Sequence, residues 1–129
     1  MHESYQYSSL TSDQSIRILV LEPAESPSAP ICCSLVEVDL DTEWEHDALS
    51  YCWQLEEPPG LICLGVGSGK EVTKPLTVGA NCYAALQVLR QSARIRLLWV
   101  DAICIDQASN SEKSQQVRLM TQIYAQAKV

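Results

Sequence analysis

One acidic residue lies inside an apolar segment in the last third of the chain. The run from Leu97 to Ile105, LLWVDAICI, predicts a strand covered on both faces, with Asp101 near its middle. A buried strand has no packing reason to hold a carboxylate, and α/β sheets place functional groups at the C-terminal ends of their strands. Asp101 is therefore a candidate catalytic residue or ligand contact. The structural alternative is that its carboxylate accepts hydrogen bonds from backbone N–H groups of the following loop.

A second carboxylate, Glu112, is a candidate general acid or base. Ser109 precedes it by three residues. This spacing also matches a capping box, in which a serine and a glutamate satisfy N–H groups at the start of a helix. The sequence therefore leaves both a catalytic and a capping role open for Glu112.

Candidate ligand-binding residues follow a short apolar run, Ala48 to Trp53, which we expect to form a buried strand. The hydroxyls of Ser50 and Tyr51 could bind a phosphate or a ribose at the strand end, and Trp53 could stack on a base. The structural alternatives are two turn hydroxyls and a tryptophan in the core.

The cysteines predict reduced, mostly buried thiols. All six lie mainly in apolar segments, without C-x-x-C spacing and without metal-site spacing to His2 or His46. Cys104 has no basic residue near it in sequence to activate it as a nucleophile. The glycine-rich segment 65–69 lacks the ending of a phosphate loop and fits a hairpin turn. The sequence therefore predicts neither a metal site nor a cofactor.

Charge and length restrict the possible partners and location. The 129-residue chain has a net charge of −7, and its first 64 residues hold 12 acidic residues against Arg17 alone. This balance argues against nucleic acid, because phosphate contacts need clustered Lys and Arg. No apolar run approaches the roughly 18 residues of a membrane span, and the N-terminus does not resemble a signal peptide. We expect a cytoplasmic protein.

The elements that would position these residues alternate between strands and helices. A loose N-terminus, residues 1–14, precedes a single domain over residues 15–129. Asn81 can cap the first helix, and Ser109 can cap the second. The expected elements are strands at Ile16–Leu21 and Ile31–Leu40 joined as a hairpin, strands at Leu61–Val66 and Glu71–Val78 joined as another, a helix from Cys82 to about Gln91, the strand Leu97–Ile105, and a helix with Val117, Met120, Ile123, Tyr124 and Ala127 on its buried face. The order after Ala48 suggests a parallel α/β layer with the hairpins attached.

Three blocks of the sequence carry the pattern of a known family. Ala48 to Trp53 matches most of A-L-S-Y-x-W-G, with Gln54 in place of the glycine. Asn81 to Arg90 matches N-L-x-x-A-L-x-x-L-R in part. Trp99 to Tyr124 matches a longer block and its helix, with Asp106 where the family usually has asparagine. In these blocks the chain resembles the HET domain, the heterokaryon-incompatibility domain of filamentous fungi.

The resemblance implies an α/β fold with a small TIR-like parallel sheet core flanked by helices and with N-terminal β-hairpin additions. The family continues into a further strand ending in W-L-G, whereas this chain ends at Val129. The resemblance therefore also implies that the domain is truncated at its C-terminal end.

For function, the resemblance implies fungal non-self recognition, a form of innate immunity, and regulated cell death. The domain would act as an interaction and signalling module with a protein partner or by self-association. The alternative is a TIR-like enzyme that cleaves NAD(P), or a nucleotide-binding domain, with Asp101 or Glu112 contributing. Some TIR domains cleave NAD with a glutamate on a later helix, and that position would fall beyond Val129.

Overall fold

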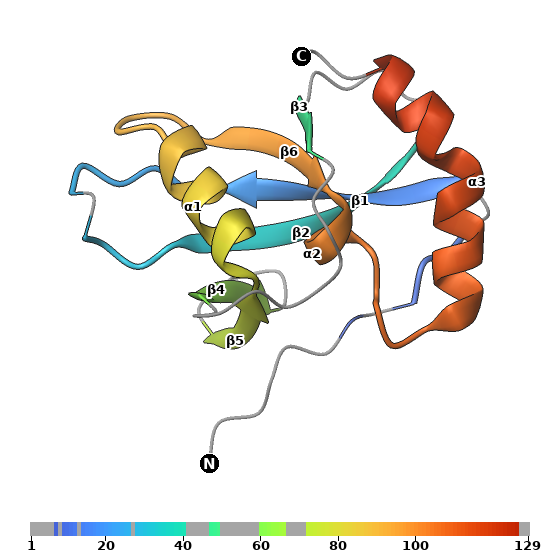
Figure 1. Cartoon of the computed structure of the whole chain (residues 1–129), viewed down its shortest axis with the longest axis horizontal. Coiled ribbons are helices and arrows are strands. Elements are labelled where there is room, and N and C mark those ends of the chain that lie inside the picture. The colour runs from blue at the N-terminus through green and yellow to red at the C-terminus, as the bar shows by residue number, and fades with distance from the viewer. Residues whose placement is uncertain are drawn as a thin grey trace.

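Six strands form one mixed sheet in the described part of the chain, and helices pack against it (Figure 1). The computed structural model describes residues 7, 9–12, 14–26, 28–40, 47–49, 60–66 and 72–126, with the backbone alone for 47–49, 66, 72, 73 and 126. In chain order the elements are β1 (Ser15–Leu21), β2 (Cys32–Asp39), β3 (Asp47–Leu49), β4 (Gly60–Val66), β5 (Val72–Val78), α1 (Ala80–Leu89), β6 (Arg96–Val100), α2 (Asp101–Cys104) and α3 (Asn110–Gln126).

β1 is a central strand of this sheet, whose order is β3-β6-β1-β2-β4-β5. It pairs antiparallel with β2 from Ser15↔Asp39 to Leu21↔Cys33, and antiparallel with β6 on its other side. All seven of its residues are buried. The continuous apolar run IRILVL is explained by this position, since a strand covered on both faces does not alternate.

The predicted hairpins are confirmed, but their place in the fold is not the expected one. The first hairpin, β1 with β2, lies in the middle of the sheet, so the description of it as an addition to a parallel core is wrong. The parallel pairs are β3 with β6 and β2 with β4, and the other neighbours are antiparallel. Local periodicity detects a hairpin, but it carries no information about which strands lie next to it.

β2 and β4 meet along a short seam. Only two residue pairs join them, Cys32↔Cys63 and Cys33↔Leu64, whereas β1 and β2 pair along seven. β4 pairs along its full length with β5 as the second hairpin. The β4–β5 hairpin is therefore attached to the rest of the sheet by few backbone contacts.

α1 packs over β4 near the end of β1, as Figure 1 shows. Cys82 and Leu86 are buried, as the apolar spacing predicted. The expected cap is wrong: the helix begins at Ala80, its N-cap is Gly79, and Asn81 lies inside the first turn. Asparagine is a frequent cap, but the chain here enters the helix directly from β5, before Asn81 is reached.

The apolar run Leu97–Ile105 is a strand followed by a short helix. β6 ends at Val100, and residues 101–104 form α2. The Cys104 thiol accepts a hydrogen bond from the Val100 N–H at 3.3 Å, which closes this turn. The prediction of one continuous strand is therefore wrong, because apolarity alone does not distinguish a buried strand from a buried helical turn.

α3 crosses the sheet at the end where β1 begins (Figure 1). Ile123 is fully buried, and Tyr124 packs edge-on against Trp99 with ring centroids 5.6 Å apart. Val117, expected in the core, is 52% exposed, while Gln116 is fully buried. Polar side chains occupy part of the inward face of the helix. A prediction from apolar residues alone therefore assigns the wrong residues to the buried face. Of the other expected core positions, Met120 is partly buried against the core and Ala127 lies outside the described residues.

Candidate functional site

Asp101 lies where the strand β6 ends and helix α2 begins. Its side chain is in the interior, with the residue only 2% exposed. Its backbone oxygen accepts a hydrogen bond from Gln107 Nε2 at 2.9 Å, which ties the following loop back to the strand end. The sequence placed Asp101 near the middle of a longer strand, whereas the structure places it just beyond the strand end. Its role as a catalytic or ligand-binding group stays a prediction.

Glu112 forms a bidentate ion pair with Arg17 of β1. The distances are 2.5 Å from Arg17 Nη1 to Glu112 Oε2 and 2.7 Å from Nη2 to Oε1. The two side chains are 5% and 10% exposed, respectively. Two parallel N–H···O bonds between a planar guanidinium and a carboxylate are a strong and directional contact. This pair joins the first turn of α3 to the centre of the sheet.

The electrostatics of Glu112 follow from its partners. Burial by itself raises the pKa of Glu112, but hydrogen bonds from Arg17 and from the Asp106 N–H, together with the charge of Arg17, outweigh it and lower that pKa below its ordinary value. The Asp106 N–H lies 2.5 Å from Oε2. Both carboxylate oxygens are thus occupied, and the group stays ionised well into the acidic range.

The capping interaction at the start of α3 is one-sided. Ser109 Oγ accepts a hydrogen bond from the Glu112 N–H at 3.2 Å, as predicted. The reciprocal half of the capping box is wrong, because the Ser109 N–H donates to the Asp106 oxygen at 3.1 Å. The Glu112 carboxylate is drawn away by a stronger, charged partner that is distant in sequence.

Arg17 is a residue of the candidate site that sequence reasoning missed. It is the one basic residue in the first half of the chain and lies within an apolar strand, and that signal could have identified it. Its Nη1 also donates to the Cys104 oxygen at 3.0 Å, and the Tyr7 ring centroid lies 4.9 Å from its guanidinium carbon. Tyr7 in turn donates its hydroxyl proton to the Ile103 oxygen at 2.6 Å. The arginine therefore connects β1, α2, α3 and the segment before β1.

A polar cavity of about 170 Å³ adjoins the Arg17–Glu112 pair. Asp106, Glu112 and Gln115 line one part of it, and Tyr7 and Ser9 another. Its volume suits a few water molecules or a very small polar ligand. Two carboxylates in its lining make it unsuitable for a phosphate group.

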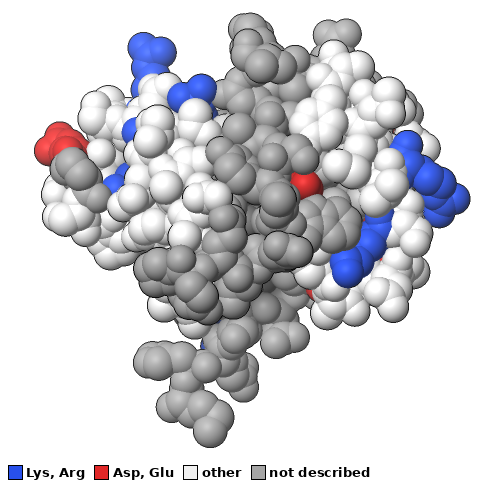
Figure 2. Space-filling model, viewed as in Figure 1, with Lys and Arg blue, Asp and Glu red and all other residues white. Residues whose placement is uncertain are grey.

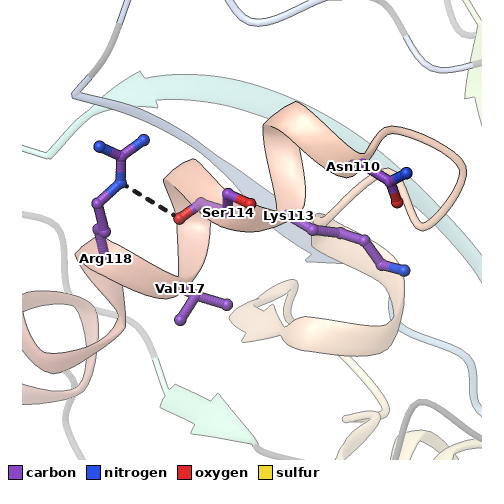
Figure 3. Close-up of a pocket in the computed structure, with 5 residues that line it drawn as sticks. All are labelled: Asn110, Lys113, Ser114, Val117 and Arg118. Carbon is purple, nitrogen blue, oxygen red and sulfur yellow. Dashed lines mark hydrogen bonds between the residues drawn. The ribbon is translucent and has the colours of Figure 1, made fainter.

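The outward side of α3 carries a wider and more open hollow of about 580 Å³. Val117 lies between Lys113 and Arg118 along this surface, with Asn110 and Ser114 beside them (Figure 3). Arg118 Nε donates to the Ser114 oxygen at 3.4 Å, which holds the guanidinium along the helix. Figure 2 shows basic side chains gathered over this end of the molecule. We call this region the α3 outer face.

The predicted ligand-binding residues Ser50, Tyr51 and Trp53 lie outside the described residues, so their roles stay predictions. β3 ends immediately before them, and its Leu49 pairs with Val100 of β6 in parallel. The C-terminal ends of β3 and β6 therefore lie level with each other at one edge of the sheet.

The described cysteines are all free thiols. Burial raises the pKa of Cys104 to about 12, which opposes a nucleophilic role. Within the described ranges, no group of three or more His, Cys, Asp or Glu residues is arranged to hold a metal ion. The helices found there are also too short or too polar to cross a membrane.

Comparisons with known proteins agree with the sequence resemblance. The family described as heterokaryon incompatibility protein (HET) matches residues 46–129. The chain is 34% identical over 119 residues to heterokaryon incompatibility protein 6, OR allele, of Neurospora crassa. That alignment covers 87% of this chain but only 17% of the relative, so the chain spans about a sixth of the relative's length. No solved structure matches the chain.

Proposed function

Because the chain belongs to the heterokaryon incompatibility (HET) family, we propose that it acts in fungal non-self recognition as an interaction module whose engagement leads to regulated cell death. The name of the Neurospora relative supports the process. We place the module in the cytoplasm, where hyphal fusion mixes the contents of two cells. Its partner is another protein or a second copy of the same domain.

The bonding of the Glu112 carboxylate is the observation that favours a binding module over an enzyme. Both oxygens of this carboxylate are bonded to Arg17 and to the Asp106 N–H. A carboxylate that neutralises a buried guanidinium is a poor general base, because taking up a proton would leave the arginine charge unpaired. Asp101, the other candidate, is 2% exposed and cannot reach a bulky substrate in this conformation.

The α3 outer face is the surface that we expect the partner to contact. Val117 supplies an exposed apolar side chain at its centre, and Lys113 and Arg118 supply positive charge around it. An apolar centre with a polar rim is the usual plan of a protein interface. The same helix is held to the sheet through Glu112, Gln116 and Ile123, so this surface is rigidly presented.

Substitution of Val117 tests the proposal in a fungal host that expresses the full natural protein. Val117→Asp should abolish the cell death that follows fusion with an incompatible strain, and it should weaken capture of the partner. Val88→Asp is the matched control, because Val88 lies on α1 and is 83% exposed. Equal activity of the two variants, with both folded by circular dichroism, would contradict a role for this face.

The alternative, a TIR-like enzyme that cleaves NAD(P), is tested on the same protein. Purified protein is incubated with NAD, and nicotinamide release is followed by chromatography. We expect no turnover. The enzyme hypothesis would be favoured over the binding module if the wild type turned over NAD and Asp101→Asn or Glu112→Gln abolished this turnover. Both variants must remain folded for this comparison.

A further inference from the structure

Two cysteines lie side by side at the seam between β2 and β4. Cys32 and Cys63 are direct partners in the parallel register, and the Cys63 N–H donates to the Ile31 oxygen at 2.9 Å. Opposite residues on neighbouring strands project to the same face, and the strands lie about 4.8 Å apart. This spacing is within the roughly 4.4–6.8 Å between Cα atoms that a disulfide requires. We propose that Cys32 and Cys63 form a reversible disulfide that fastens this seam under oxidising conditions.

Burial distinguishes this pair from the other described cysteines. Cys32 and Cys63 are half-buried, so a small oxidant can reach them, whereas Cys33, Cys82 and Cys104 are buried. Cys33 faces Leu64 across the seam and has no thiol opposite it. The Cys63 side chain is near enough to that of Cys32 to raise the pKa of Cys32. The sheet therefore selects one pair before any oxidation takes place.

The environment of Cys32 sets how quickly it responds. Burial and the neighbouring Cys63 raise its pKa above the ordinary value, although the guanidinium of Arg90 acts in the opposite direction. Only the thiolate attacks a disulfide, so the reaction is slow at neutral pH.

The reaction balances with a small-molecule disulfide such as oxidised glutathione. One cysteine of the pair loses its thiol proton, and the resulting thiolate attacks a glutathione sulfur. A mixed protein–glutathione disulfide forms as the S–S bond of oxidised glutathione breaks, and one glutathione thiolate leaves. The second thiolate then attacks the mixed disulfide and displaces the other glutathione. The protein loses two protons and two electrons, and oxidised glutathione becomes two molecules of reduced glutathione.

The bond would lie at the junction with the fewest paired residues among the described strands. Two residue pairs join β2 to β4, and the new S–S bond would connect one of them covalently. Separation of the β4–β5 hairpin from the sheet would then require breaking a covalent bond. The effect is a more protected β4 under oxidation.

Thiol mapping of the folded protein tests the proposal. The chain is incubated in buffers of defined reduced and oxidised glutathione, alkylated, and cleaved after glutamate, because trypsin leaves Cys32, Cys33, Cys52 and Cys63 on one peptide, residues 18–70. We expect a crosslink between the peptide 26–37 and the peptide that contains Cys63, with loss of two alkylatable thiols. The initial rate should rise about tenfold from pH 7 to pH 8, as thiolate attack requires.

Variants and a denatured control make the outcome specific. Cys32→Ala and Cys63→Ala should each abolish the crosslink, and Cys33→Ala should retain it. In urea the adjacent Cys32 and Cys33 should react alike, because the selection by the sheet is lost. Hydrogen exchange of β4 should slow on oxidation in the wild type and not in Cys63→Ala. A fully reduced pair in the most oxidising buffer, glutathione adducts alone, or an equal crosslink in Cys32→Ala would overturn the proposal.

Discussion

Replacement of Glu112 by glutamine should destabilise the domain strongly, although the two side chains have nearly the same shape. The change removes the negative charge opposite Arg17, whose side chain is 5% exposed. It also replaces one of the two carboxylate oxygens by an NH₂ group that cannot accept a hydrogen bond. Either the guanidinium or the Asp106 N–H then loses part of its bonding.

The expected loss in the free energy of unfolding is about 3 kcal/mol. Breaking a buried ion pair by removing one partner costs roughly 3–5 kcal/mol, because an unpaired charge stays in the interior. The lower end applies here, since Arg17 keeps its 3.0 Å bond to the Cys104 oxygen and its contact with the Tyr7 ring. Small domains have a total stability of only about 5–15 kcal/mol, so the variant should be close to unfolding at growth temperature.

Urea denaturation followed by circular dichroism measures this loss. With a slope of about 2 kcal/mol per molar urea, the midpoint should fall by roughly 1.5 M. Glu37→Gln is the matched control: Glu37 is exposed, and it accepts bonds from the Thr11 N–H and hydroxyl, so its change should cost less than about 1 kcal/mol. A loss below about 0.5 kcal/mol for Glu112→Gln, typical of surface positions, would refute the reasoning that the pair is desolvated.

Three further changes probe the same fold. The pKa of Glu112 is lower in the folded state than in the unfolded chain, so the unfolded chain binds more protons in acid. The stability that this group contributes is present above its unfolded pKa of about 4.5 and is lost as the pH falls through its folded pKa. Wild type should therefore lose more stability than Glu112→Gln between pH 6 and pH 3 in thermal melts, and parallel curves would contradict this. Gly60→Ala should cost about 1–3 kcal/mol, because the new Cβ would lie 2.2 Å from the Tyr83 ring and 2.6 Å from the Tyr83 Cβ; Tyr83→Ala, which removes the ring and keeps that Cβ, should relieve part of the cost in the double variant, and additive losses in urea denaturation would argue against the ring contact. Trp99→Ala should cost about 3–5 kcal/mol, whereas Trp99→Phe should cost below about 1.5 kcal/mol, because the buried Nε1 makes no hydrogen bond within the described structure; similar losses for both would point to a bound partner for that N–H.

Much of the local structure could be predicted from the sequence, because it depends on nearby residues. The run IRILVL indicated a strand, and Ser109 indicated the start of a helix. The Arg17–Glu112 pair could not be predicted in this way, since its members are 95 residues apart and meet only after the sheet has formed. The capping box offered a sufficient local explanation for Glu112, and so concealed the long-range one.

The orientation of α3 also depends on a contact with a residue distant in sequence, and so could not be predicted from local pattern. Gln116 is fully buried, and its Nε2 donates to the Ser15 oxygen at 3.0 Å, while the apolar Val117 faces outward. A polar side chain can be buried when a backbone acceptor in the interior lies within hydrogen-bonding distance of it. No pattern of apolar residues reveals such an acceptor, because Ser15 lies on another element.

The order of the strands has a consequence for synthesis on the ribosome. β6, the last strand of the described residues, inserts between β1 and β3, which are both made much earlier. Until residues 96–100 emerge, one edge of β1 is open, and it displays an apolar strand that could pair with other chains. We expect nascent or prematurely terminated chains that lack β6 to aggregate or to depend on a chaperone. A stop codon before residue 96 would therefore yield an insoluble product and not merely a shorter domain.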